Sequence, residues 1–225
     1  MIKAVLIDID NTLLDFHKCS KESMCLAAEE FGIDFPENYF QIFTEINNGL
    51  WEKIEKGELT RQGLFKVRWN LIFEAMGIKA DGPAFDELFR EYIKKSAIPV
   101  EGAKEILEYL SEKYYVCVAS NFSYEQQKAR LSKAGMLPYI KEIFTSEEIG
   151  FAKPSTEFFE SCVNGLSSFG KDEIMLIGDS ITADIKGGKN FGLKTCWFNF
   201  EKKSDAVCDS ADFIVDDLLQ IKNIL

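Results

Sequence analysis

The most constraining feature of the sequence is an alternation between short apolar runs and longer stretches with helical periodicity. The first run, residues 3–9 (KAVLIDI), is apolar nearly throughout and ends at carboxylates. A strand that is apolar on both faces is typical of a parallel sheet covered by helices. Similar runs occur further along the chain, at residues 114–119, 143–145, 174–177, 194–198 and 213–215.

Stretches with helical patterns separate these runs. They span residues 103–113, 124–134, 156–166 and 181–191, and residues 216–225 indicate a closing helix. Strands and helices in alternation predict a doubly wound α/β fold, in which helices cover both faces of a parallel sheet and the crossovers are right-handed.

Residues 16–98 interrupt this alternation. They contain no strand pattern, and their helical patterns span residues 18–31, 37–56, 60–76 and 83–97, with glycines near the ends. We therefore expect two domains. Residues 1–15 and 99–225 form the α/β core, and residues 16–98 form a helical domain inserted after the first strand.

Carboxylates follow two of the predicted strands. Asp8 and Asp10 (DIDNT) end the first strand, where residues two apart project from one face. Asp179 follows the run at 174–177, and Asp184 lies beyond it (GDSITADI). Ligands of open α/β sheets bind at the carboxyl ends of strands, so these carboxylates are expected to converge. Close like charges need a cation or a proton between them, and oxygen ligands that leave room for water suit Mg²⁺.

Further polar residues fit a phosphoryl site at the same edge. Ser120 and Asn121 follow the run at 114–119, where a hydroxyl and backbone N–H groups would hold phosphoryl oxygens. Lys153 lies in a loop before a helix (GFAKPS), where its ammonium would neutralise phosphate and nucleophile together. Each motif alone also fits an ordinary turn, an N-cap or a surface lysine. Their occurrence in order, each beside a predicted strand or helix, indicates a phosphoryl-transfer site.

Composition argues against several other classes of site and partner. His17 is the only histidine, so a zinc site built from several imidazoles and Ser-His-Asp or Cys-His catalysis are disfavoured. The net charge of −11 disfavours a nucleic-acid polymer. No apolar run approaches the ~20 residues of a membrane span, and the first residues do not resemble a signal peptide. We expect a cytoplasmic protein with no membrane or nucleic-acid partner, as a monomer or a small homo-oligomer.

These motifs resemble those of the haloacid dehalogenase-like (HAD) hydrolases. DIDNT matches the first motif of that family, Ser120 with Asn121 the second, Lys153 the third and GDSITADI the fourth. The inserted helices resemble the α-helical cap that follows the first motif. The segments NNGLWEKIEKGELT, SEEIGFAKP and KTCWFN also resemble the YjjG-type branch, whose members are 5′-nucleotidases for noncanonical pyrimidine nucleotides.

The resemblance implies a Mg²⁺-dependent phosphatase that works through an aspartyl phosphate on a small phosphorylated metabolite, a nucleotide in this branch. Asp8 would attack phosphorus, and Asp10 would protonate the leaving ester oxygen and then activate water. The residues implied to hold the cation are Asp8, Asp10 (through its backbone carbonyl), Asp179 and Asp184. The residues implied to hold the phosphoryl group are Thr12, Ser120, Asn121 and Lys153.

The cap is expected to close over the site and to select the leaving group. Candidates for stacking against a base are Phe16, Trp51, Phe65 and Trp69. Aromatic residues at helical spacing more often form a core, which is the alternative for each of them. Asn47 and Asn48 could read a base edge, or they could cap a helix or form a turn.

Other functions stay open. Within the same fold, the substrate could be another small metabolite such as phosphoglycolate or a sugar phosphate. A phospho-receiver switch and a non-catalytic protein that binds a phosphorylated ligand are the alternatives from other classes. The helical insertion and Asp10 count against the switch, and the intact carboxylates with Lys153 count against the non-catalytic protein. A dehalogenase is disfavoured because the acidic metal set is complete and Asp10 is present.

Overall fold

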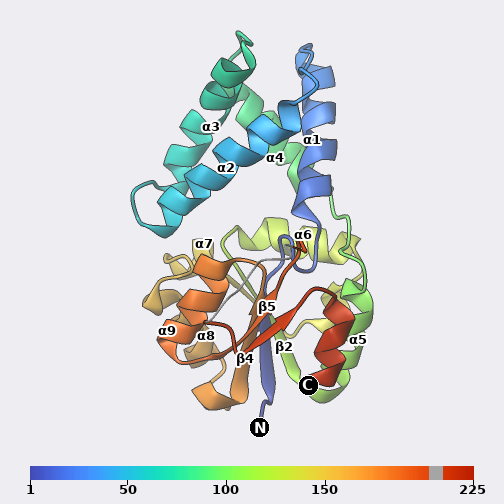
Figure 1. Ribbon diagram of the computed structural model, residues 1–225, viewed down its shortest axis with the longest axis vertical. Helices are drawn as coiled ribbons and strands as arrows, with labels where there is room; N and C mark the ends of the chain where they lie inside the picture. Colours follow the sequence, from blue (N-terminus) through green and yellow to red (C-terminus); the bar gives the residue numbers. More distant parts are fainter. Residues whose placement is uncertain (203–209) are drawn as a thin grey trace. The chain divides into compact units, whose positions relative to one another are not determined.

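The computed structural model describes residues 1–202 and 210–225, and in these residues it contains a six-stranded sheet (Figure 1). The strand order is β3-β2-β1-β4-β5-β6, and each neighbouring pair is parallel. The strands are β1 (Ala4–Ile7), β2 (Tyr115–Ser120), β3 (Glu142–Thr145), β4 (Ile174–Gly178), β5 (Lys194–Phe198) and β6 (Phe213–Val215). The prediction of a doubly wound α/β fold is confirmed, and β1 lies between β2 and β4.

Helices cover both faces of the sheet. On one face, Val5 and Ile7 of β1 belong to an apolar core that includes residues of α5 (Ala103–Lys113) and α6 (Tyr124–Lys133). On the other face, Ala4 and Leu6 pack with residues of α8 (Thr156–Gly165). Alternate residues of β1 therefore serve opposite cores, which is why the first run is apolar without interruption.

Two segments of the α/β unit differ from the sequence prediction. In place of one helix over 181–191, a π-helical turn η3 (Ile181–Lys186) is followed by the short α9 (Gly187–Phe191). The N–H groups of Asp184 and Ile185 both donate to the Ser180 carbonyl (3.0 and 3.1 Å), which widens the turn. In place of a closing α-helix over 216–225, the chain forms a 3₁₀ helix, η4 (Leu218–Asn223), capped by Asp217. The remaining short elements are η1 (Leu137–Tyr139), α7 (Ser146–Ile149) and η2 (Lys171–Glu173).

The chain divides into two compact units, Met1–Phe16 with Ala97–Leu225, and His17–Ser96. The helices of the inserted segment are α1 (Phe16–Phe31), α2 (Tyr39–Glu55), α3 (Arg61–Met76) and α4 (Gly82–Lys95). They correspond to the helical stretches expected from the sequence, while the assignment of this segment as a separate domain stays a prediction. Among the described residues, no helix combines the length and the apolarity that a membrane span requires.

Aromatic rings fill the centre of the helical unit. Trp69 of α3 is fully buried, and its ring centroid lies 4.3 Å from that of Phe85 and 5.3 Å from that of Phe89. Trp69 is therefore a core residue rather than a surface for stacking against a base. Asn47 is also buried, and its side-chain oxygen accepts a hydrogen bond from Arg68 Nη1 (3.2 Å), so it serves the interior of this unit.

A buried ion pair lies in the same interior. Arg68 donates through Nε and Nη2 to one oxygen of Asp86 (2.9 and 2.8 Å), and Arg90 Nε donates to the other (2.9 Å). Burial lowers the pKa of Arg68, and the charge of Asp86 opposes that effect. A buried cation without its partner is strongly destabilising, whereas an apolar pair of similar volume is often tolerated.

We predict that Asp86→Leu destabilises the protein by about 3–5 kcal/mol, because it leaves the buried Arg68 without its carboxylate. The double variant Arg68→Met/Asp86→Leu should recover most of that loss. Urea unfolding followed by tryptophan fluorescence measures both, with the exposed Glu87→Gln as control. A single-variant loss of no more than about 0.5 kcal/mol, the range of surface substitutions, would contradict the prediction.

Candidate active site

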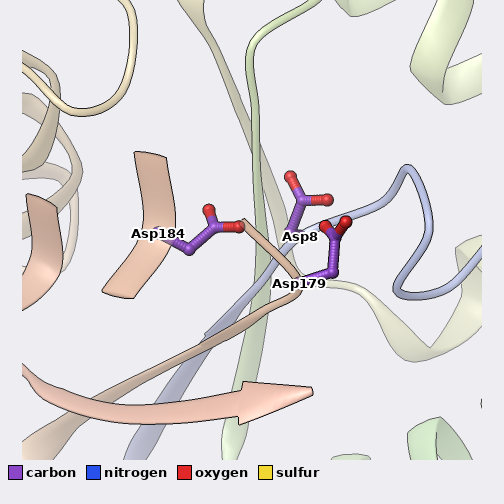
Figure 2. Close-up of side chains that lie close together, drawn as sticks. All are labelled: Asp8, Asp179 and Asp184. Carbon is purple, nitrogen blue, oxygen red and sulfur yellow. The ribbon is translucent and has the colours of Figure 1, made fainter. Parts of the chain in front are cut away.

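Three carboxylates meet at the carboxyl end of the sheet. Asp8 follows β1, Asp179 follows the neighbouring β4, and Asp184 lies in η3. One oxygen of each lies within 4.8 Å of the others. Figure 2 shows Asp8 and Asp179 projecting from the ends of adjacent strands, with Asp184 reaching toward them from its helical turn. We call these three residues the carboxylate cluster.

Lys153, in the loop between α7 and α8, is the cation in contact with this cluster. Its Nζ donates to Asp8 Oδ1 (2.5 Å), to Asp184 Oδ1 (2.7 Å) and to the carbonyl of Ala119 (2.7 Å). The side chain is 2% exposed, so all three hydrogens of the ammonium are used within the protein. The structure therefore places Lys153 against Asp8, the residue that the sequence predicts to be the nucleophile, and the catalytic role of each stays a prediction.

Asn121 holds the backbone of that lysine in place. Its Nδ2 donates to the Lys153 carbonyl (2.8 Å), and its Oδ1 accepts from the Lys153 N–H (2.7 Å). These reciprocal bonds fix the loop after α7 against the end of β2. The side chain of Asn121 is thus used for positioning, and only its backbone N–H remains a candidate for contact with a phosphoryl group.

Burial and charge shift the pKa values of Asp8, Asp179 and Lys153. Burial raises the pKa of Asp8 to about 7, the charge of Lys153 opposes the rise, and Asp184 adds to it. Burial and the charge of Asp8 also raise the pKa of Asp179 well above its ordinary value. Burial disfavours the charged form of Lys153, but Asp184 and Asp8 outweigh it and raise its pKa.

One ammonium does not balance three carboxylates. Without a metal, a proton on one of the carboxylates relieves the repulsion, as their raised pKa values indicate. The oxygen-only donors also fit a hard divalent cation, because such ions prefer carboxylate ligands and separate like charges. The carboxylate cluster could therefore hold a metal ion. The cluster does not include the side chain of Asp10, whose backbone carbonyl stays a predicted ligand.

Gly178 makes the approach of Asp184 possible. A Cβ atom at this position would lie 2.3 Å from Asp184 Oδ2, a distance that no real side chain tolerates. The same oxygen accepts a hydrogen bond from the Ser180 N–H (3.1 Å). The glycine and the turn after β4 together bring Asp184 to the cluster.

Thr12 and Ser120 lie at the same edge of the sheet. Thr12 is fully buried, and its Oγ1 lies 3.5 Å from Asp179 Oδ1. Ser120 ends β2, is 2% exposed, and accepts a hydrogen bond from Gln127 Nε2 (2.8 Å) through its hydroxyl oxygen. Their proposed contacts with a phosphoryl group stay predictions.

Asp10 faces a different environment, which the sequence reasoning missed. Gln127 and Arg130 of α6 are buried, and they donate to the two oxygens of the Asp10 carboxylate (2.8 and 2.7 Å). The sequence of α6 contained a signal for this contact. A helix between strands is expected to turn an apolar face to the sheet, and these polar residues are three apart beside Leu131 on that face.

Comparisons with known proteins identify a matching family model and similar hydrolases. Residues 2–192 match the family model of the haloacid dehalogenase-like hydrolases. Pyrimidine 5′-nucleotidase PynA from Streptococcus pneumoniae is 31% identical, over 99% of this chain and 97% of that protein. Ribulose-1,5-bisphosphate 5-phosphatase from Halopiger xanaduensis is 30% identical, over 94% of this chain and 90% of that protein.

A solved structure agrees with these relatives. The HAD-hydrolase YfnB from Bacillus subtilis, in a crystal form bound to magnesium, matches with a TM-score of 0.92 and 30% identity, over 100% of this chain and 98% of that one. The similarity to PynA supports the resemblance to the YjjG-type branch. Given the family model, the relatives and the motifs at the sheet edge, the chain belongs to the haloacid dehalogenase-like hydrolase family.

Proposed function

We propose that this protein is a magnesium-dependent phosphatase that hydrolyses phosphomonoesters through an aspartyl phosphate on Asp8. The observation that supports this most is the contact of Asp8 with Lys153 inside the carboxylate cluster. Phosphoryl transfer depends chiefly on positioning and on electrostatic stabilisation. A nucleophile that lies beside a fixed cation and a candidate metal site can approach an anionic phosphoryl group.

The proposed reaction has two displacements at phosphorus. An oxygen of Asp8 bonds to phosphorus while the bond to the ester oxygen breaks, and Asp10 gives that leaving oxygen a proton. In the second step, Asp10 takes a proton from water as the water oxygen bonds to phosphorus. The bond between phosphorus and Asp8 then breaks, and inorganic phosphate leaves. Lys153 offsets the negative charge at Asp8 before the transfer and at the phosphoryl group after it.

Mg²⁺ is the cation that fits the cluster best. Asp8, Asp179 and Asp184 would hold it, since they offer oxygen ligands within 4.8 Å of one another. When bound, it would offset charge on the phosphoryl oxygens and on the nucleophile. The structure of YfnB bound to magnesium, in a protein 30% identical to this chain, supports the choice.

For the substrate, we propose a nucleoside 5′-monophosphate with a noncanonical pyrimidine base. The relative PynA, named for pyrimidine nucleotides and matched over nearly its whole length, supports this class. The ribulose-1,5-bisphosphate 5-phosphatase has nearly the same identity to this chain, so a sugar phosphate is the second candidate.

A substrate screen separates these classes. With Mg²⁺ present, we expect kcat/KM for pyrimidine nucleoside 5′-monophosphates to exceed that for sugar phosphates and phosphoglycolate by about 10-fold or more, a difference that about 1.4 kcal/mol of transition-state binding supplies. A preference for a sugar phosphate would contradict the nucleotide assignment alone. No turnover of any monoester would contradict the phosphatase assignment as well.

Replacement of the nucleophile tests the covalent route. Asp8→Asn should lower kcat by about 10³-fold or more, because the amide removes the attacking carboxylate. The melting temperature of the Asp8→Asn variant should stay at or above that of the wild type, because the substitution removes one of the crowded carboxylates. The exposed Asp172→Asn serves as control for kcat and stability. Turnover within about tenfold of the wild type would contradict attack by Asp8.

Metal binding can be tested without turnover. Excess Mg²⁺ should raise the melting temperature of the wild type, with a stabilisation of about 2.7 kcal/mol at 100 times Kd. Asp179→Asn should lose this rise, and its metal-free form should be at least as stable as the metal-free wild type because repulsion with Asp8 is relieved. Thermal unfolding with and without Mg²⁺ measures both, and Asp172→Asn should keep the full rise. An equal rise in Asp179→Asn would remove this residue from the metal site.

A further inference from the structure

Gln127 and Arg130, which we call the α6 clamp, are joined to Asp10 and to each other by hydrogen bonds. Arg130 Nη1 donates to Asp10 Oδ1 (2.7 Å), and Gln127 Nε2 donates to Asp10 Oδ2 (2.8 Å). Arg130 Nη1 also donates to Gln127 Oε1 (3.0 Å). Each oxygen of the carboxylate therefore has its own donor, and the two donors are tied to each other.

The chemistry of the groups fixes the orientation of the Gln127 amide. A guanidinium has only donors, so the amide oxygen must face Arg130. The two hydrogens of Nε2 then face Asp10 and the hydroxyl oxygen of Ser120, which accepts at 2.8 Å. Because Ser120 accepts this bond, its own hydrogen remains available to donate to a phosphoryl oxygen.

The clamp is buried, while Asp10 stays partly accessible. Gln127 and Arg130 are 0% and 1% exposed, whereas the side chain of Asp10 is 27% exposed. Polar side chains are buried at a cost unless they are hydrogen-bonded, and an apolar residue would pack this face of α6 as Leu131 does. Packing therefore does not explain the choice of Gln127 and Arg130 here, and their hydrogen bonds to Asp10 do.

We propose that Gln127 and Arg130 are positioning residues that hold the carboxylate of Asp10 toward the leaving-group oxygen and away from the carboxylate cluster. The inference rests on the proposed function, in which Asp10 transfers the proton. Asp10 is two residues from Asp8, so without the clamp its carboxylate would be drawn to the cation or to Lys153. A carboxylate whose oxygens are bound to a cation is less able to carry the proton that the ester oxygen needs.

The test compares two esters that differ in their need for a proton. 4-Nitrophenyl phosphate releases nitrophenolate without protonation, whereas the best alkyl ester of the substrate screen needs an acid. In Arg130→Met and in Gln127→Met, kcat/KM for the alkyl ester should fall by about 100-fold, the effect of a displacement of about 1 Å, and that for the aryl ester by less than about fivefold. Since kcat/KM covers only the steps through the first irreversible one, the later hydrolysis of the aspartyl phosphate does not obscure the comparison.

Controls separate positioning from stability. Arg130→Lys, which keeps a cationic donor, should recover part of the alkyl activity, and Lys128→Gln on the exposed face of α6 should match the wild type. Melting temperatures show whether each variant folds. If Arg130→Met does not fold, the comparison of the two esters is made with Gln127→Met alone. Equal losses on both esters, or a rise in KM alone, would overturn the inference while leaving the phosphatase assignment intact. A wild type inactive on every ester would instead overturn the proposed function.

Discussion

The burial of like charges at one edge of the sheet is the constraint on which the site depends. Asp8, Asp179 and Asp184 bring oxygens within 4.8 Å of one another, and Lys153 contacts two of them. Such crowding is unfavourable unless a cation offsets it. The surrounding structure serves this arrangement, because Asn121 fixes the backbone of Lys153 and the glycine before Asp179 leaves room for Asp184.

Asp8 and Asp10 are similar groups that lie in different environments. They lie two residues apart after β1, so the strand alone gives them equal access to the site. Asp8 contacts Lys153, while Asp10 contacts Gln127 and Arg130 on α6. In the proposed mechanism, the cation beside Asp8 would favour attack by that carboxylate, and the fixed donors around Asp10 would favour its role in proton transfer.

Much of the α/β fold and of the carboxylate cluster could be predicted from the sequence, for physical reasons. The uninterrupted apolar run before Asp8 reflects burial of β1 on both faces. In open α/β sheets, ligands bind at the carboxyl ends of the strands, which is where the carboxylates lie. The π-helical turn could not be predicted, because it depends on Ser180 accepting two backbone bonds. Helical periodicity also does not distinguish a core ring such as Trp69 from one that faces a ligand. It likewise does not show that polar side chains of α6 point inward to Asp10.

The formation of an aspartyl phosphate on Asp8 is the central claim, and chemical trapping tests it most directly. Enzyme turning over its best ester with Mg²⁺ would be quenched in acid and reduced with borohydride, which converts an aspartyl phosphate to homoserine. Peptide mass spectrometry would then locate the change. The account predicts homoserine at position 8 in the wild type only when substrate is present. Efficient turnover with unmodified Asp8, or with the label on another residue, would contradict it.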